Sequence, residues 1–91
     1  MTHAIVLIEA ERGAMPTLGS RLADIEGVGQ VYSVTGAWDF VAIVHVPRHE
    51  QLADVVTAGI GQLEGVSRTQ TMVAFEAFSR HDLEALFSVG Q

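Results

Sequence analysis

Residues 32–46 read YSVTGAWDFVAIVHV, and this stretch decides the fold. Val31–Thr35 and Trp38–Val46 are rich in β-branched and aromatic side chains, which is typical of strands. Gly36 and Ala37 stand between them, and glycine adopts the positive φ that hairpin turns require at no steric cost. The stretch therefore predicts a β-hairpin.

Asp39 places a carboxylate at the otherwise apolar entry to the second strand of this hairpin. One interpretation is that its oxygens accept backbone N–H bonds and close the turn. Another is that it forms one wall of a small polar pocket beside the open backbone of Gly36. The rest of the chain bears on which interpretation applies.

The composition favours a small domain that associates with itself. The chain has 91 residues, which predicts a single domain over residues 1–91, and 48% of them are hydrophobic. A domain of this size leaves a large share of its surface exposed, so one core cannot hide all of this apolar surface. We therefore expect contact between copies of the chain.

The charge and the cysteine count exclude several function classes. The net charge is −6 with only five Lys and Arg residues, whereas nucleic-acid affinity comes mainly from cationic contacts to phosphates. We therefore expect no direct nucleic-acid binding. The chain has no cysteine, which excludes disulfides, thiolate metal sites and a cysteine nucleophile. The first residues, Met-Thr-His, carry no basic leader and no long apolar run, which predicts a cytoplasmic protein without membrane contact.

The remaining elements follow from hydrophobic periodicity and from glycine positions. Two longer helices are predicted, and each ends at a Glu-Gly-Val triplet, at residues 26–28 and 64–66, where glycine suits the helix end. Together with the hairpin, the predicted elements make up a domain whose central part covers residues 3–78. The other predicted elements are a strand over His3–Ala10, a helix over Met15–Glu26, a helix over Glu50–Leu63, a strand over Ser67–Phe78 and a short tail helix over Asp82–Val89.

This βαββαβ order predicts an α+β, ferredoxin-like fold. Right-handed crossovers arrange it as a four-stranded antiparallel sheet with two helices on one face. The strands over His3–Ala10 and Trp38–Val46 carry apolar side chains on both faces, and two helices cover only one. We therefore expect a face-to-face homodimer, a dimeric α/β barrel.

The topology gathers polar residues at one end of the sheet, which we call the polar end. A carboxylate there can pair with an ammonium group, and backbone N–H groups near a glycine can hold a carboxylate. The polar end is therefore suited to a small zwitterion. Its predicted residues are Glu9, Thr35, Gly36, Asp39, Thr69 and Thr71.

Two motifs here resemble the effector-binding domain of the Lrp/AsnC transcriptional regulators, also called the RAM domain. They are Tyr-x-Val-Thr-Gly-x-x-Asp at Tyr32–Asp39 and Gly-Val-x-x-Thr-x-Thr at Gly65–Thr71. The resemblance implies a ferredoxin-like domain that dimerises through its sheet and assembles into higher rings, up to an octamer of four dimers. It also implies that amino-acid effectors bind where dimers meet. The ligand-binding residues would then be Gly36, Asp39, Thr69 and Thr71.

The sequence departs from the family pattern in two respects. Typical members carry a DNA-binding helix-turn-helix before this domain, and no such segment precedes residue 3 here. We therefore expect a stand-alone amino-acid-binding and oligomerisation module that regulates transcription through a full-length Lrp/AsnC regulator. Trp38 stands next to Asp39, and its bulk either shapes or blocks the pocket.

Two other functions stay open at this point. Small dimeric α/β-barrel enzymes, such as monooxygenases and isomerases, share this topology and use a His or an acid. His3 and His45 lie at neighbouring strand ends where the imidazoles can meet, but no recognisable motif supplies a third metal ligand. We therefore predict no catalytic residue, no metal site, no cofactor and no enzyme. The other open hypothesis is a purely structural oligomerisation module.

Overall fold

The computed structural model describes residues 1–78 and residue 80, so the predicted tail helix over Asp82–Val89 lies outside the described part. The strands and helices follow the predicted βαββαβ order. They are β1 (Thr2–Ala10), α1 (Met15–Ala23), β2 (Val28–Ser33), β3 (Phe40–Val46), the short helices η1 (His49–Gln51), η2 (Asp54–Gly59) and η3 (Ile60–Gln62), and β4 (Val66–Ala74).

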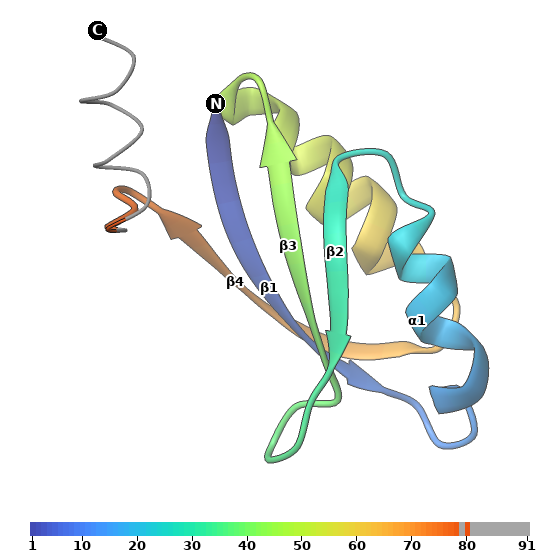
Figure 1. Cartoon of the computed structure of the whole chain (residues 1–91). Helices are drawn as coiled ribbons and strands as arrows, with labels where there is room; N and C mark the ends of the chain where they lie inside the picture. Colours follow the sequence, from blue (N-terminus) through green and yellow to red (C-terminus); the bar gives the residue numbers. More distant parts are fainter. Residues whose placement is uncertain (79, 81–91) are drawn as a thin grey trace, which may run out of the picture.

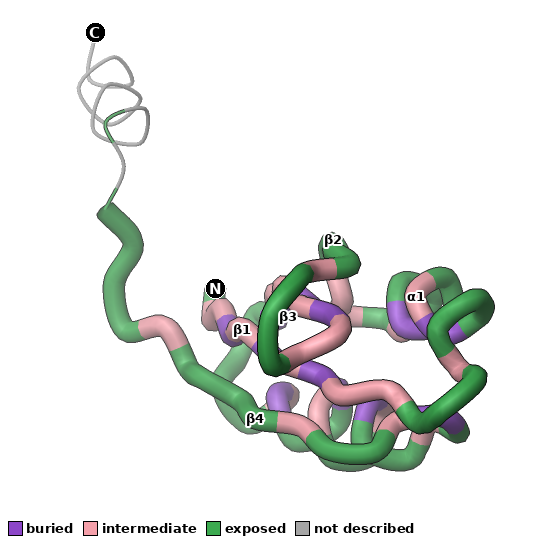
Figure 2. The backbone as a smooth tube through the Cα atoms, turned by 90° about the horizontal axis from the view of Figure 1, so that it is seen from below, coloured by how far each residue is buried: buried purple, intermediate pink, exposed green. Residues whose placement is uncertain are grey.

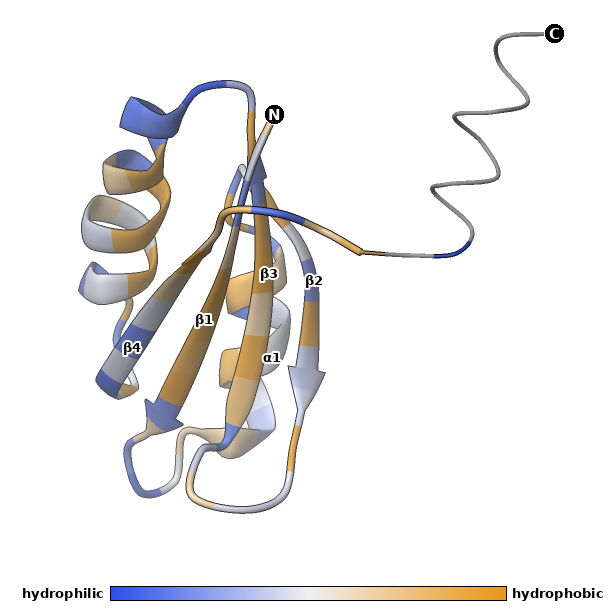
Figure 3. Ribbon diagram, turned by 90° about the vertical axis from the view of Figure 1, so that its left-hand side faces the viewer, coloured by the Kyte–Doolittle hydropathy of each residue, from blue (hydrophilic) through white to orange (hydrophobic). Residues whose placement is uncertain are grey.

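The four strands form one antiparallel sheet in the order β2-β3-β1-β4. The two most apolar strands, β1 and β3, are therefore central, which is where strands covered on both faces belong. Figure 1 and Figure 3 show α1 and the second helical segment, residues 49–62, on the same side of this sheet. The ferredoxin-like prediction is confirmed.

The core lies between the sheet and the helices (Figure 2). Alternate residues of β1 and β3 point into it, as the period of two in a strand requires. The helices contribute one buried stripe each, although Met15 at the start of α1 remains 42% exposed. The buried core residues are Ala4, Val6, Ile8, Leu18, Leu22, Phe40, Ala42, Val44, Val46, Leu52, Val55 and Ile60.

The opposite face of the sheet, which we call the open face, carries rows of side chains across the strands. In one row, Tyr32 of β2 lies opposite Val41, which in turn lies opposite Leu7. In the next row, Ile43 lies opposite Ile5, which lies opposite Met72 of β4. No helix covers this face in Figure 3, where β1 and β3 are largely hydrophobic. The predicted excess of apolar surface is therefore located here.

The hairpin connection is longer than predicted. β2 ends at Ser33 and β3 begins at Phe40, so residues 34–39 form a loop rather than a tight turn. The loop is closed by a bond from Val34 N–H to the Asp39 carbonyl at 3.0 Å, while Asp39 N–H donates to the Ile8 carbonyl at 2.9 Å. Gly36 has a φ of +104°, so the expected positive φ is confirmed.

Both helical segments also depart from the prediction. Helix α1 ends at Ala23 instead of Glu26, because Ile25 N–H bonds to the Leu22 carbonyl in a tighter turn. Residues 49–62 form 3₁₀ turns around a π-helical stretch, Asp54–Gly59, where we expected one regular helix. Gly59 and Gly61 near the end of this segment disfavour a regular helix there.

Strand β4 ends at Ala74 instead of Phe78. Ala74 pairs with His3, and the pairing of β4 with β1 ends at this point. Phe75 and Phe78 are consequently 96% and 87% exposed. Among residues 1–78 and 80, no helix has the length and apolar character needed to cross a bilayer.

Candidate functional site

The polar end is held together by a small ionic network on β1 and β4. Glu9 lies opposite Arg68 in the strand register, and their charged groups are 3.4 Å apart. Ser67 Oγ donates to the other Glu9 oxygen at 3.2 Å. The Arg68 guanidinium also stacks over Trp38, 4.3 Å from the ring centroid, which is cation–π geometry. Trp38 therefore packs against β4 and fixes one side of the loop that carries Asp39.

Asp39 is anchored to the backbone of β1. Its Oδ2 accepts a hydrogen bond from Ala10 N–H at 2.8 Å, at the point where the β1–β4 register shifts between Glu9 and Ala10. The side chain thus satisfies a backbone donor that the irregular ladder leaves over. Its second oxygen, Oδ1, accepts no hydrogen bond from any other described residue. One oxygen has a structural role, and the other is available to a ligand.

Thr69 and Thr71 lie on the other face of the sheet from the ionic network. Thr69 is opposite Ile8 and Thr71 is opposite Val6, and both partners are buried in the core. Directly opposed residues project to the same face, so both threonines lie on the helix-covered side. Thr69 is half-buried and Thr71 is exposed, and neither hydroxyl bonds to another described residue. Within one chain, neither threonine hydroxyl is therefore hydrogen-bonded to Asp39.

Gly36 presents open backbone at the tip of the 34–39 loop. A Cβ built there would meet no atom within 4 Å, so the space around the glycine is free. The predicted ligand-binding residues do not all lie at the polar end, because Thr71 is opposite Val6 in the middle of β1. None of the four lines a described cavity, so they form an open surface rather than an enclosed pocket. A ligand held by all four would need walls from outside a single chain.

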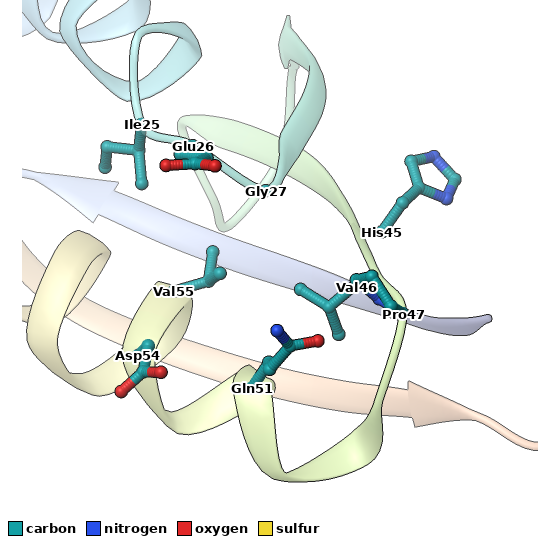
Figure 4. Close-up of a pocket in the computed structure, with 9 residues that line it drawn as sticks. All are labelled: Ile25, Glu26, Gly27, His45, Val46, Pro47, Gln51, Asp54 and Val55. Atoms are coloured by element: carbon teal, nitrogen blue, oxygen red, sulfur yellow. The ribbon is translucent and has the colours of Figure 1, made fainter.

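The two described cavities are lined by other residues. The larger, with a volume of about 610 Å³, lies at the opposite end of the sheet between the end of α1, the end of β3 and the second helical segment (Figure 4). Of its polar side chains, sequence reasoning singled out His45, as the partner of His3, and Glu26, as part of the Glu-Gly-Val triplet. It missed Gln51 and Asp54. The lining residues are Ile25, Glu26, Gly27, His45, Val46, Pro47, Gln51, Asp54 and Val55.

The smaller cavity, about 320 Å³, lies beside the β1–α1 connection. Arg21 of α1 lines it and donates to the Glu64 carbonyl at 3.2 Å, so α1 is tied to the segment just before β4. None of the four predicted ligand-binding residues lines it. Its lining residues are Glu11, Arg12, Gly13, Ala14, Thr17, Arg21, Glu64 and Gly65.

His3 and His45 do meet, as their strand-end positions predicted. They are directly opposed in the β1–β3 register, their ring centroids are 4.6 Å apart and the rings are almost perpendicular at 89°. The two Nδ1 atoms are in hydrogen-bonding contact. Within the described residues, no group of three or more His, Cys, Asp and Glu side chains is arranged to hold a metal ion.

The comparisons with known proteins agree on one family. Residues 3–83 match the family model described as the Lrp/AsnC ligand binding domain. The HTH-type transcriptional regulator PF0250 of Pyrococcus furiosus is 32% identical over 77 residues, which cover 81% of this chain and 51% of that protein. The chain thus spans about half the length of the curated relatives it matches.

Solved structures show the same fold. The protein TTHA0845 from Thermus thermophilus is 48% identical with a TM-score of 0.82, covering 88% of this chain and 100% of that one. The transcriptional regulator NMB0573 from Neisseria meningitidis, solved as an L-Met complex, is 12% identical with a TM-score of 0.78. That match covers 87% of this chain and 53% of the regulator.

Proposed function

The chain belongs to the Lrp/AsnC ligand-binding domain family, and from this premise we propose that it binds a free amino acid, without transforming it, and assembles with copies of itself. The observation that carries the proposal is the divided role of Asp39. Its Oδ2 is fixed by Ala10 N–H, which holds the carboxylate in place, while Oδ1 has no partner among the described residues. A fixed, half-free carboxylate is suited to an ammonium group.

The open backbone at Gly36 supports the second half of this recognition. The space around Gly36 is free, so backbone N–H groups near it can donate hydrogen bonds to the carboxylate of a zwitterion. NMB0573, a regulator with the same fold, was solved as an L-Met complex, which agrees in ligand class. The side chain of the ligand would lie beside Trp38, whose position is set by Arg68.

We propose that a second copy completes the site. Thr69 and Thr71 lie on the helix-covered face of β4, whereas Asp39 is anchored to Ala10 at the end of β1, so a single chain does not surround a ligand that touches both. Two copies that meet at the polar end can enclose it between them. Ligand binding and assembly would then be coupled, because a ligand that binds only the assembled form stabilises it.

The open face supports a separate, sheet-to-sheet contact. Its two rows place Ile5, Leu7, Val41 and Ile43 at the centre, where no described element covers them. Tyr32 at the margin is 51% exposed. A face-to-face dimer would remove this surface from water, and contacts at the polar end would join dimers into rings.

A regulatory role would pass through a longer relative. The curated relatives that match the chain are HTH-type regulators about twice as long as the matched segment. We propose that this chain, within residues 1–91 as one domain, influences such a regulator by mixed assembly or by competing for the same amino acid.

The test begins with thermal unfolding in the presence of each of the twenty amino acids, because a ligand that binds the folded state raises its melting temperature. Calorimetry then compares wild type with Asp39→Asn, whose amide oxygen still accepts from Ala10 N–H while the charge is lost. We expect Asp39→Asn to lose about 1.5–3 kcal/mol of binding free energy, roughly ten- to a hundredfold in affinity.

Asp24→Asn is the matched control, since this exposed carboxylate at the end of α1 is remote from the polar end. Equal affinities of wild type and Asp39→Asn would remove Asp39 from the ligand contact. Binding by none of the amino acids would favour the structural module, in which the Asp39–Ala10 bond is the entire role of the side chain. Turnover that requires His3 or His45 would favour the enzyme.

A further inference from the structure

The histidine pair on β1 and β3 is not used by the proposed amino-acid site. His3 and His45 lie at the end of the sheet remote from Gly36 and Asp39, and both side chains are half-buried. In the strand register they share the open face with Ile5 and Ile43, which lie two positions away on the same strands. The pair therefore needs an explanation of its own.

The geometry of the pair resembles half of a metal centre. The two Nδ1 atoms point at each other, and the rings are almost perpendicular with centroids 4.6 Å apart. Without a metal, this contact requires one nitrogen to donate a proton and the other to accept it. With both imidazoles neutral and both lone pairs directed at the space between them, the same rings can bind one cation after a small separation.

The space for this arrangement is provided by β2. A Cβ on Gly29 would lie 2.7 Å from Cδ2 and 3.2 Å from Nε2 of His45, so any larger residue would push the ring away. Figure 4 shows the His45 ring directed away from the other labelled side chains of the large cavity. The imidazole is thus held against the sheet, beside His3, and not inside the cavity.

We propose that His3 and His45 form a two-imidazole binding site for a borderline divalent transition-metal ion such as Zn²⁺. Imidazole nitrogens bind Zn²⁺, Cu²⁺ and Ni²⁺, whereas Mg²⁺ and Ca²⁺ prefer oxygen ligands. No third His, Cys, Asp or Glu among the described residues joins the pair, so the remaining coordination positions belong to water. This arrangement differs from the sequence-based expectation, which required a third protein ligand.

The ion would link the two central strands of the sheet. Because β1 and β3 are far apart in sequence, the site exists only in the folded chain. Metal binding therefore adds to the free energy of unfolding.

The test is Zn²⁺ titration by calorimetry on the full chain, prepared without a histidine tag. We expect His3→Ala and His45→Ala each to lose at least about tenfold in Zn²⁺ affinity, because even altering residues that only support metal ligands costs this much. His49→Ala is the matched control, since His49 is exposed in η1, and it should retain wild-type affinity.

A second measurement on unmodified protein guards against variants that fail to fold. Long-range ¹H–¹⁵N spectra of the imidazoles report which nitrogen binds, and Zn²⁺ should shift Nδ1 of His3 and of His45. Unchanged affinity in His45→Ala would overturn the proposal, since His3 would then hold the ion without His45. Absence of saturable binding up to about 1 mM Zn²⁺, a Kd equivalent to only about 4 kcal/mol, would also overturn it.

Discussion

The turn after α1 provides a sharp test of the packing, through substitution of Gly27 by alanine. Gly27 has a φ of +98°, and a Cβ there would lie 2.5 Å from Cγ2 of Val55. Gly13 is the matched control, because it also has a positive φ, +86°, but its Cβ would meet nothing within 4 Å. Both substitutions force alanine into a conformation that costs about 1–3 kcal/mol.

Only Gly27→Ala adds an overlap inside the core. Overpacking of this kind typically costs about 1–3 kcal/mol, so we expect Gly27→Ala to lower the free energy of unfolding by that much more than Gly13→Ala. The backbone cost and the effect on the unfolded chain cancel in the difference. This makes the difference a direct measure of contact between the turn and the second helical segment.

The assay is urea unfolding followed by far-UV circular dichroism at one fixed protein concentration, because association shifts apparent stability. If Gly27→Ala costs no more than Gly13→Ala, the turn does not pack against Val55 as described. The double substitution Gly27→Ala with Val55→Ala provides a further check. Removing the Val55 methyl groups should relieve the overlap, so the double variant should lose less free energy of unfolding than the two single variants lose in sum.

Three further predictions concern surfaces. Leu7→Glu, which places a charge in the centre of the open face, should shift the light-scattering mass toward the monomer. The control Ala23→Glu, on the exposed side of α1, should leave the mass unchanged, and equal masses of the two variants would refute the sheet-to-sheet dimer. Arg68→Ala should change Trp38 fluorescence while lowering the free energy of unfolding by only about 1 kcal/mol, because the pair with Glu9 is largely exposed, and unaltered fluorescence would contradict the stacking. The chain, with a net charge of −6, should not shift a DNA duplex at physiological salt, and salt-sensitive binding would reveal a basic surface that we have not recognised.

The sequence predicted the architecture because its strongest signals are those that topology depends on. The double-sided apolar pattern of β1 and β3 predicted a sheet with an uncovered apolar face, and the Glu-Gly-Val triplets predicted the junctions between helix and strand, where Gly27 and Gly65 have φ values near +100°. The π-helical stretch Asp54–Gly59 was not predictable, because its apolar spacing suits a regular helix equally well.

The candidate site was predicted less completely. Topology placed Asp39, Thr69 and Thr71 at one end of the sheet, but the face on which a side chain lies depends on a register that a shift of one residue reverses. Only the observed pairing of Thr69 with Ile8 assigns the threonines to the helix side. The bond between Asp39 and Ala10 likewise depends on an irregularity of the β1 register, which neither composition nor residue spacing reveals.

The position of β1 has a consequence for how the chain is made. This strand leaves the ribosome before the other three strands, and its partners come much later, since His3 pairs with His45 on one side and with Ala74 on the other. A nascent chain that ends before β4 holds an apolar strand with one unpaired edge, the kind of surface that chaperones bind and that aggregates readily. We therefore expect the domain to fold only after β4 has been synthesised, and truncation before residue 66 to yield insoluble product.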